Sequence, residues 1–276
     1  MGGKKSIGID FYADPLNVLR MGLPSVMDEN QPRALLFVVA YNEEKNLGPL
    51  IAEIREKVRL PGWRWDLVVV DDGSSDGSGR VAADCGARVL RHPVNLGIGA
   101  AEMTGLLFAR KRGYDLAVRM DGDGQHPPEG VADLVAAVVE GKAHLSIGSR
   151  FVDGSAEGFR STFLRRIGIG YFSLLCFLLT GKRIKDPTSG FRCFTRESIE
   201  ALTAVPAQDY PEVESFIDAS RWGLRVLEVP SRFRERRGGA SSIHPVRSVY
   251  FMIKVTLAIL VASIRARPAR EHRGEA

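Results

Sequence analysis

Short apolar runs alternate with segments of helical periodicity along the first 150 residues. Residues 34–40 and 67–70 are almost purely apolar and have the length of strands buried on both faces. Between them, residues 43–58 repeat apolar side chains every three to four positions, as an amphipathic helix does. The pattern continues with expected strands at 88–91, 116–120 and 145–149, and with expected helices at 75–85, at 98–112 and from Pro127 onward. Such alternation predicts right-handed βαβ units and an α/β fold with a mainly parallel central sheet flanked by helices.

The second half of the chain has a different pattern. Residues 163–180 form a long apolar segment that begins with arginines and ends at Gly181, which predicts a helix. A polar loop is expected at 186–192, a further strand at 224–229, and a basic, glycine-containing loop at 232–242. The regular alternation of strands and helices therefore ends near residue 150.

The apolar segment 249–264 allows three interpretations. A helix that crosses a membrane needs roughly 20 apolar residues, whereas this segment is shorter and contains Lys254. A C-terminal amphipathic helix that lies on a bilayer surface or against a membrane partner is favoured; a helix packed on the core and a membrane span stay open. The basic tail fits attraction to anionic lipids, with Arg265, Arg267, Arg270 and Arg273.

Composition narrows the class of protein. The 276 residues are 45% hydrophobic, enough to bury the core of one large domain with appendages. We expect a variable leader at 1–33, a main domain at 34–243 and a C-terminal helix with a tail at 244–276. The net charge of +5 suits anionic ligands or an anionic membrane surface, and the absence of nucleic-acid-binding motifs predicts no nucleic-acid partner. Three scattered cysteines and a leader without an apolar core predict a cytoplasmic protein without disulfides.

Carboxylates follow two of the expected strands directly. Asp71 and Asp72 end the strand at 67–70, and Asp121 and Asp123, separated by one glycine, end the strand at 116–120. The carboxyl ends of parallel strands meet at one edge of a sheet, where ligands of open α/β folds bind. Two hard oxygen ligands so close together suit a divalent metal that also holds phosphates. His126 beside them is either a further ligand or a packing residue at the start of a helix.

A succession of motifs across the chain resembles a known family. The motifs are Ala40-Tyr41-Asn42-Glu43, Val70-Asp71-Asp72-Gly73-Ser74, Asn95-Leu96-Gly97, Asp121-Gly122-Asp123-Gly124-Gln125, Gly148-Ser149-Arg150, Asp186-Pro187-Thr188-Ser189-Gly190-Phe191-Arg192 and the stretch from Arg236 to Ser241. Their order and spacing resemble family 2 glycosyltransferases of GT-A (Rossmann-like) fold, in the branch of dolichyl- and polyprenyl-phosphate mannose or glucose synthases. The resemblance runs from about residue 34 to residue 242.

The resemblance implies a set of site residues. It implies Mg²⁺ or Mn²⁺ held by Asp121, Asp123 and Gln125 on the diphosphate of a nucleotide-sugar donor. Donor-binding residues would be Ala40, Tyr41, Glu43, Asp71, Asp72, Gly97, Asp121, Gly122, Arg165, Arg166 and Ser241. Catalytic residues would be Asp123, Asp186, Glu214, Arg150 and Arg236. Where relatives often carry Gly-x-Ser-Lys, this chain has Gly239-Ala240-Ser241-Ser242, and Arg234 or Arg237 is a candidate to replace the missing lysine.

The chemistry of sugar transfer agrees with this set. Negative charge develops on the leaving diphosphate, and a metal and arginines neutralise it. A lipid-phosphate acceptor is already anionic and needs no general base, so we expect single displacement with inversion, dominated by positioning. A hydroxyl acceptor would need a base, for which Asp186 and Glu214 are the candidates.

The expected enzyme is a metal-dependent inverting transferase that moves one sugar from GDP-mannose or a UDP-hexose to a polyprenyl or dolichyl phosphate. We expect it at the cytoplasmic face of a membrane, against anionic lipid or a small membrane-protein partner. Two alternatives stay open: transfer to a hydroxyl of a glycan, a protein or a small molecule, and a non-catalytic nucleotide-sugar-binding partner of a membrane protein. The sequence disfavours processive polysaccharide synthesis, because it offers no bundle of membrane spans.

Overall fold

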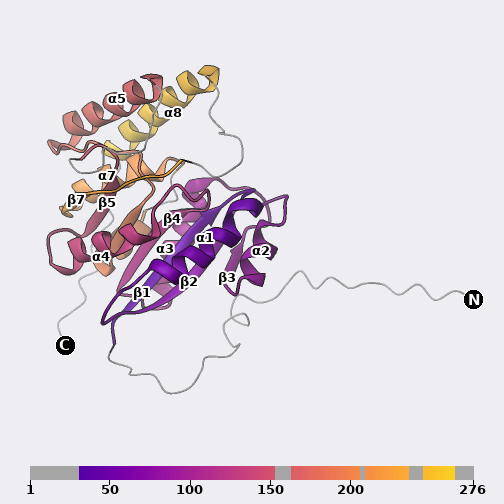
Figure 1. Cartoon of the computed structure of the whole chain (residues 1–276). Coiled ribbons are helices and arrows are strands. Elements are labelled where there is room, and N and C mark those ends of the chain that lie inside the picture. Colours follow the sequence, from indigo (N-terminus) through magenta and orange to yellow (C-terminus); the bar gives the residue numbers. More distant parts are fainter. Residues whose placement is uncertain (1–30, 153–162, 206–208, 236–244, 265–276) are drawn as a thin grey trace, which may run out of the picture. The chain divides into compact units, whose positions relative to one another are not determined.

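The computed structural model describes residues 31–152, 163–205, 209–235 and 245–264, and it confirms an α/β fold around a seven-stranded sheet (Figure 1). The strands are β1 (Arg33–Ala40), β2 (Arg64–Asp71), β3 (Arg88–Arg91), β4 (Leu116–Asp121), β5 (Leu145–Ser149), β6 (Arg192–Thr195) and β7 (Val226–Pro230). The helices are α1 (Glu44–Lys57), α2 (Ser78–Asp84), α3 (Ile98–Lys111), the short 3₁₀ helix η2 (Pro128–Gly130), α4 (Val131–Val139), α5 (Phe163–Thr180), α6 (Arg196–Thr203), α7 (Pro211–Arg221) and α8 (Pro245–Ile264).

The strand order is β3-β2-β1-β4-β6-β5-β7. Strands β1 to β4 are parallel to one another, and β7 is parallel to β5, whereas β6 runs antiparallel to both β4 and β5. The chain moves outward from β1 to β3 and then returns to β4 on the other side of β1. The carboxyl ends of β1 and β4 therefore flank the point where the strand order reverses, which is where open α/β sheets bind ligands.

Strand β1 shows why the sheet is covered on both faces. Its side chains point alternately to opposite sides. Phe37 packs in one core with α3, α5, α6, α7 and α8, and its neighbour Val38 packs in a second core with α1, α2 and α4. A strand buried on both faces must be apolar throughout, which explains the uninterrupted run at 34–40.

Most expected elements of the first half are present, and three parts of the second half differ from the expectations. The strands at 88–91 and 145–149 and the helix at 163–180 have the expected bounds. The helix expected at 75–85 begins only at Ser78, without a side-chain cap. Strand β6 and helices α6 and α7 were not expected. Strand β6 is only four residues long and directly follows a polar loop, so its sequence gives little signal. The cysteines are free, as expected.

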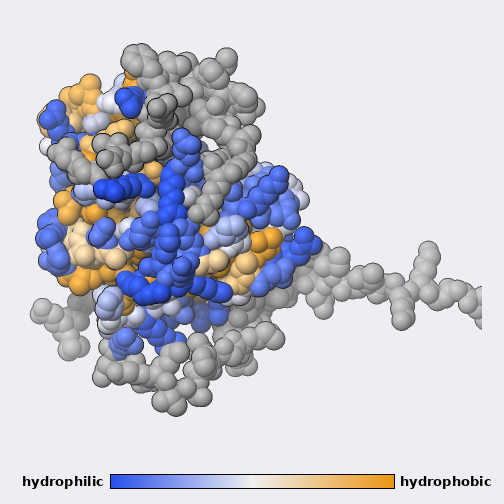
Figure 2. Space-filling model, in the orientation of Figure 1, coloured by the Kyte–Doolittle hydropathy of each residue, from blue (hydrophilic) through white to orange (hydrophobic). Residues whose placement is uncertain are grey.

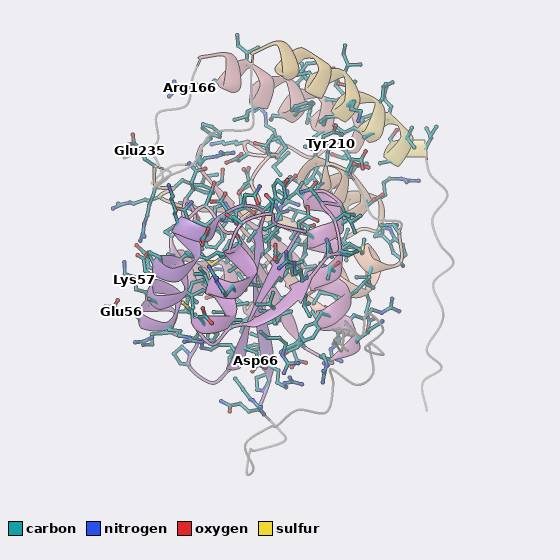
Figure 3. The ribbon with its side chains drawn as sticks, turned by 90° about the vertical axis from the view of Figure 1, so that its right-hand side faces the viewer. Glu56, Lys57, Asp66, Arg166, Tyr210 and Glu235 are labelled. Atoms are coloured by element: carbon teal, nitrogen blue, oxygen red, sulfur yellow. The ribbon has the colours of Figure 1, made fainter. Side chains whose placement is uncertain are left out.

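Helices α5 and α8 lie side by side beyond one face of the sheet, as two perpendicular views show (Figures 1 and 3). Helix α8 turns Val255, Ile259 and Ala262 into the core. Within the described residues, no helix combines the length and the apolarity needed to cross a bilayer. The core-packed interpretation of the segment at 249–264 is therefore correct for one face of the helix.

Candidate active site at the carboxyl edge of the sheet

The polar motifs that follow β1, β2 and β4 meet at one edge of the sheet. Ala40 pairs with Asp71 across β1 and β2, and Val39 pairs with Asp121 across β1 and β4. The Gly122 N–H donates to the Val39 carbonyl at 2.8 Å, and an added Cβ at Gly122 would lie only 3.1 Å from Ala40. A side chain at Gly122 would press on β1, so glycine between the two aspartates lets the loop lie directly on that strand.

The two adjacent carboxylates after β2 have different surroundings. Asp72 accepts hydrogen bonds from the N–H groups of Leu96 and Gly97, both at 2.9 Å, and lies 2.7 Å from His92 Nδ1. Asp72 thereby fixes the loop that leads into α3. Asp71 accepts from the Ser74 N–H at 2.9 Å, and its second oxygen lies 3.5 Å from Arg91 Nε.

The other predicted donor-binding residues at this edge differ in exposure. Tyr41 is 47% exposed directly after β1, whereas Glu43 is buried and accepts a hydrogen bond from Asn46. Gly97 precedes the first turn of α3 with a positive φ of 93°. The structure brings Tyr41, Asp72 and Gly97 to one edge, and their contact with a nucleoside stays a prediction.

The loop of Asp121, Asp123 and Gln125 is closed by the chain that follows β7. Asp123 accepts from the Gln125 N–H at 3.0 Å, which turns the loop sharply. The carbonyl of Gln125 accepts from the Arg234 N–H at 2.9 Å, and the Gln125 amide donates back to the Arg234 carbonyl at 3.3 Å. Arg234 itself pairs with Glu53 and Glu129. Arg234 therefore fastens the loop from Asp121 to Gln125 to α1 and η2, and its replacement of the missing lysine stays a prediction.

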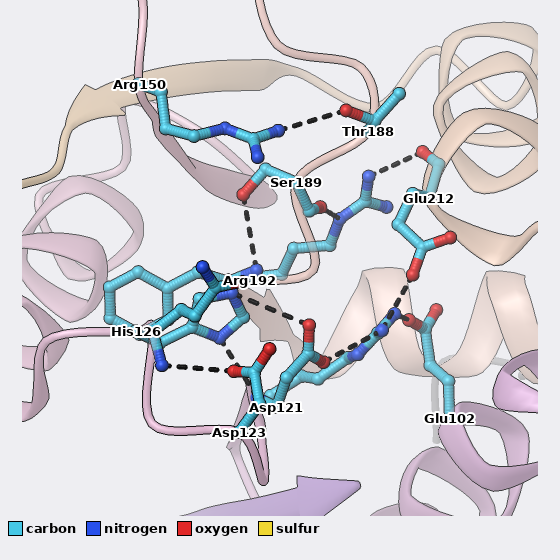
Figure 4. A network of polar contacts seen from close by, with 12 residues as sticks. Glu102, Asp121, Asp123, His126, Arg150, Thr188, Ser189, Arg192 and Glu212 are labelled. Carbon is cyan, nitrogen blue, oxygen red and sulfur yellow. Dashed lines mark hydrogen bonds and ion pairs between the residues drawn. The ribbon is translucent and has the colours of Figure 1, made fainter. Parts of the chain in front are cut away.

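Two fully buried arginines, Arg119 and Arg192, belong to this site; Arg192 is labelled in Figure 4. Neither was assigned a role from the sequence, where Arg192 only ended the motif at 186–192. Arg119 donates to Glu102 on α3, to Asp121 at 3.1 Å and to Glu212 on α7 at 2.7 Å. Burial alone would lower the pKa of Arg119, but the carboxylates of Glu212, Asp121 and Glu102 hold it well above its ordinary value. A charged residue in the middle of an otherwise apolar strand was the available signal, because buried charges need partners.

The same pairing affects Asp121. Burial alone would raise the pKa of this carboxyl group, but the charge of Arg119 lowers it below its ordinary value. Asp121 is therefore ionised near neutral pH, and its side chain keeps 29% of its surface exposed. A carboxylate in this state can bind a cation.

Gly190 allows the loop before β6 to come close to the loop from Asp121 to Gln125. A Cβ at this position would lie 2.8 Å from the Arg119 guanidinium and 2.9 Å from an oxygen of Asp121. Only glycine allows this approach without displacing the carboxylate. The motif at 186–192 therefore packs against Asp121 through Gly190.

Arg150 and Asp186, both predicted to be catalytic, form a buried ion pair with each other. The guanidinium donates to both oxygens of Asp186, at 2.7 and 2.6 Å, and the Arg150 N–H adds a third bond at 3.0 Å. Asp186 is fully buried. Glu214 is also buried, and it accepts from the Tyr210 N–H at the start of α7 at 3.0 Å. Both predicted base candidates are thus engaged with protein donors.

His126 is buried directly after the loop from Asp121 to Gln125. Its ring stacks on Phe191 and meets Phe233 edge-on, and its Nδ1 accepts the Asp121 N–H at 3.0 Å. Burial lowers the pKa of His126 to about 4, so the ring is neutral near pH 7. Of the two interpretations of this histidine, packing is the one that its position supports.

The residues at the loop fit a divalent cation that completes its coordination on a ligand. No group of three or more His, Cys, Asp or Glu side chains in the described ranges is arranged to hold a metal by itself. Mg²⁺, however, is usually bound by only one or two carboxylates together with substrate phosphates. The described network contains the arginines Arg119, Arg150 and Arg192 and the carboxylates Glu102, Asp121, Asp123, Asp186 and Glu212. Asp121 and Asp123, the two carboxylates of the loop, are the ones that such a cation would take.

The remaining predicted residues stand outside this geometry. Arg166 is exposed in the first turn of α5. Arg236, Arg237 and Ser241 lie outside the described residues, as does the side chain of Arg165.

Comparisons with known proteins agree with this arrangement. The family "Glycosyl transferase family 2" matches residues 36–203. A polyprenol monophosphomannose synthase of Mycolicibacterium smegmatis is 34% identical over 223 residues, which cover 76% of this chain and 81% of that protein. An undecaprenyl-phosphate mannosyltransferase of Micrococcus luteus is also 34% identical, over 76% of this chain and 87% of its own.

A solved structure supports the fold. Glucosyl-3-phosphoglycerate synthase from Mycobacterium tuberculosis, crystallised with Mn²⁺, UDP and glucosyl-3-phosphoglycerate, superposes with a TM-score of 0.61 at 24% identity, covering 85% of this chain and 80% of that chain. The sheet has the GT-A architecture that the motifs predicted. The chain is an enzyme of the glycosyltransferase class and belongs to glycosyl transferase family 2.

Proposed function

We propose that this protein is a metal-dependent inverting glycosyltransferase that moves one sugar from GDP-mannose or a UDP-hexose to a polyprenyl phosphate at the cytoplasmic face of a membrane. The observation that carries the proposal is the partly exposed Asp121–Asp123 loop at the carboxyl edge of the sheet, where Arg119 and the Gln125 N–H hold the two carboxylates. The names of the relatives from M. smegmatis and M. luteus support a polyprenyl-phosphate acceptor.

Asp121, Asp123 and Gln125 would hold the cation. When bound, Mg²⁺ or Mn²⁺ supplies neutralisation of the charge that develops on the leaving diphosphate. Arg119 orients Asp121, and the short Asp123–Gln125 turn orients Asp123, so both carboxylates are held in place before the donor arrives. Such preorganisation lowers the barrier because little has to move during the reaction.

The state of the two base candidates supports an anionic acceptor. Both oxygens of Asp186 are held by Arg150, and Glu214 caps α7, so either group would have to break protein hydrogen bonds in order to take a proton. A hydroxyl acceptor requires such a proton transfer. A lipid phosphate does not, because its oxygen is already charged near neutral pH, and transfer then depends on positioning.

Helices α5 and α8 offer a surface for the membrane. Large apolar side chains are exposed on both helices: Ile167, Tyr171, Leu174, Phe177 and Leu178 on α5, and Ile253, Leu257, Leu260, Val261 and Ile264 on α8. Figure 2 shows apolar (orange) surface at the upper left, where α5 lies in Figure 1. Neither helix contains an acidic residue, and Arg166, Lys182, Arg183 and Lys254 are exposed on or beside them. Apolar surface with only positive charge suits an anionic bilayer.

A nucleotide-release assay tests the proposed reaction. Purified protein is incubated with Mn²⁺ or Mg²⁺ and a panel of GDP- and UDP-sugars, with and without a short polyprenyl phosphate. We expect release with one donor only when the lipid is present, and its loss in Asp123→Ala. Asp84→Ala, which removes an exposed carboxylate at the end of α2, is the matched control and should keep full activity. Release with a hydroxyl acceptor in place of the lipid would contradict the proposed acceptor.

Vesicle flotation tests the membrane surface separately. We expect the protein to float with vesicles that contain anionic lipid, and a Leu174→Glu/Leu178→Glu variant to stay in the soluble fraction. Equal flotation of the variant would remove α5 from the proposal.

A further inference from the structure

The buried guanidinium of Arg119 links the metal loop to helix α7. Its Nη2 donates both to Asp121 Oδ1 at 3.1 Å and to Glu212 Oε1 at 2.7 Å, while Nη1 donates to Glu102 on α3. Figure 4 labels these three carboxylate partners. One nitrogen thus serves two carboxylates from distant parts of the chain. The strength of the Arg119–Asp121 interaction therefore depends on the competing bond to Glu212.

Helix α7 is held firmly enough to make this sharing constant. Arg192 on β6 donates from Nη2 to the Glu212 carbonyl and from Nη1 to the Ser215 hydroxyl. Both arginines are fully buried, so neither can exchange these partners for bulk water. The first turn of α7 therefore presents Glu212 to Arg119 in a fixed position.

We propose that Glu212 is a positioning residue for the divalent cation: by sharing Arg119 with Asp121, it keeps the Asp121 carboxylate available to the metal. The inference rests on the proposed metal dependence of the enzyme. If the charge of Glu212 is removed, the Arg119 guanidinium interacts more strongly with Asp121, and the site loses one negative charge. Both effects weaken cation binding.

Direct titration of Mn²⁺ tests the proposal without any turnover. The electron paramagnetic resonance signal of free Mn²⁺ measures its dissociation constant, with GDP and UDP as the nucleotide probes. We expect Glu212→Gln to raise this constant at least about tenfold, because the attraction between a unit charge and a divalent cation a few ångströms away corresponds to such a change even at the dielectric constant of water. Asp84→Asn, which removes one exposed charge on α2, is the control and should change it less than about twofold.

A second variant separates the sharing of Arg119 from the charge alone. Glu212→Asp keeps the charge but shortens the side chain by one methylene, so the bond to Arg119 is lost or lengthened. We expect it to raise the Mn²⁺ dissociation constant by about threefold, whereas a simple charge effect would leave it unchanged. It also carries the test if Glu212→Gln fails to fold, which thermal unfolding of each variant reveals.

The outcomes distinguish the inference from the proposed function. Wild-type protein that binds no Mn²⁺ with either nucleotide would overturn the proposed metal dependence and this inference together. If the wild type binds Mn²⁺ and both Glu212 variants bind it with the same dissociation constant as the wild type, the inference alone is overturned.

Discussion

Two ion pairs with the same shortest N–O distance and different burial should differ strongly in their effect on stability. Arg150–Asp186 and Arg196–Asp115 both have an N–O distance of 2.6 Å. Both aspartates also accept a backbone N–H, at 3.0 Å from Arg150 and 2.8 Å from Arg33. The side chains of the first pair are only 4% and 0% exposed, whereas those of the second are 47% and 37% exposed. The buried pair also has a second guanidinium bond, from Arg150 Nε at 2.7 Å, so the two pairs differ in burial and in the number of bonds but not in their shortest distance.

Asp186→Ala would leave the Arg150 charge buried without its counter-ion. Removal of one partner of a buried pair costs about 3–5 kcal/mol. Asp115→Ala removes an exposed pair and one hydrogen bond, for about 1–2 kcal/mol. At about 2–4 °C per kcal/mol for a domain of this size, we expect Asp186→Ala to lower the unfolding temperature by about 6–20 °C and Asp115→Ala by a few degrees.

Differential scanning calorimetry or thermal circular dichroism of the wild type and both variants measures these shifts. Asp186→Ala should unfold at a lower temperature than Asp115→Ala at both of two salt concentrations. Added salt should reduce only the effect of Asp115→Ala, whose ion pair is exposed. Equal shifts for the two variants would refute the reasoning that burial, and not distance, determines the effect of the pair.

Three further predictions concern the metal loop and its supports. Gly190→Ala should weaken Mn²⁺ binding and sugar transfer, because its Cβ would press on Asp121 and Arg119, whereas Gly170→Ala on α5 meets no atom within 4 Å and should stabilise the helix by about 1 kcal/mol; calorimetry and Mn²⁺ titration check both, and a Gly190→Ala protein with unchanged Mn²⁺ affinity would contradict the close packing. Burial alone would raise the pKa of Glu53, but hydrogen bonds from Lys57 and Arg234 lower it to about 2 from an ordinary value of 4.5. Its contribution to stability is therefore present above about pH 4.5 and is lost as the pH falls toward 2. The protection of the Arg234 N–H against hydrogen exchange, relative to the intrinsic rate at each pH, should therefore fall in that window, and in Glu53→Gln it should already be low at pH 6. Arg234→Ala should raise the Mn²⁺ requirement for activity, since the Arg234 side chain, through Glu53 and Glu129, fixes the backbone that bonds Gln125, and an unchanged requirement would show that the loop is held without it.

The first half of the fold could be predicted closely from the sequence. Strands buried on both faces must be continuous apolar runs, and the runs at 34–40 and 67–70 mark β1 and β2 for that reason. Because parallel strands share one carboxyl edge, the aspartates at 71–72 and 121–123 were expected together, and the register of β1 with its two neighbours brings them there.

The interior of the site was decided only by the tertiary structure. Strand β6 enters between β4 and β5 in the opposite direction, which the local pattern of four residues does not encode. Arg119 finds Glu212 across 93 positions of the chain, and Arg150 and Asp186 pair across 36. Periodicity reports which face of an element is buried, and a motif reports which chemistry is present. The partner of a buried charge is set by the packing of distant elements, because only packing removes the water that would otherwise satisfy that charge.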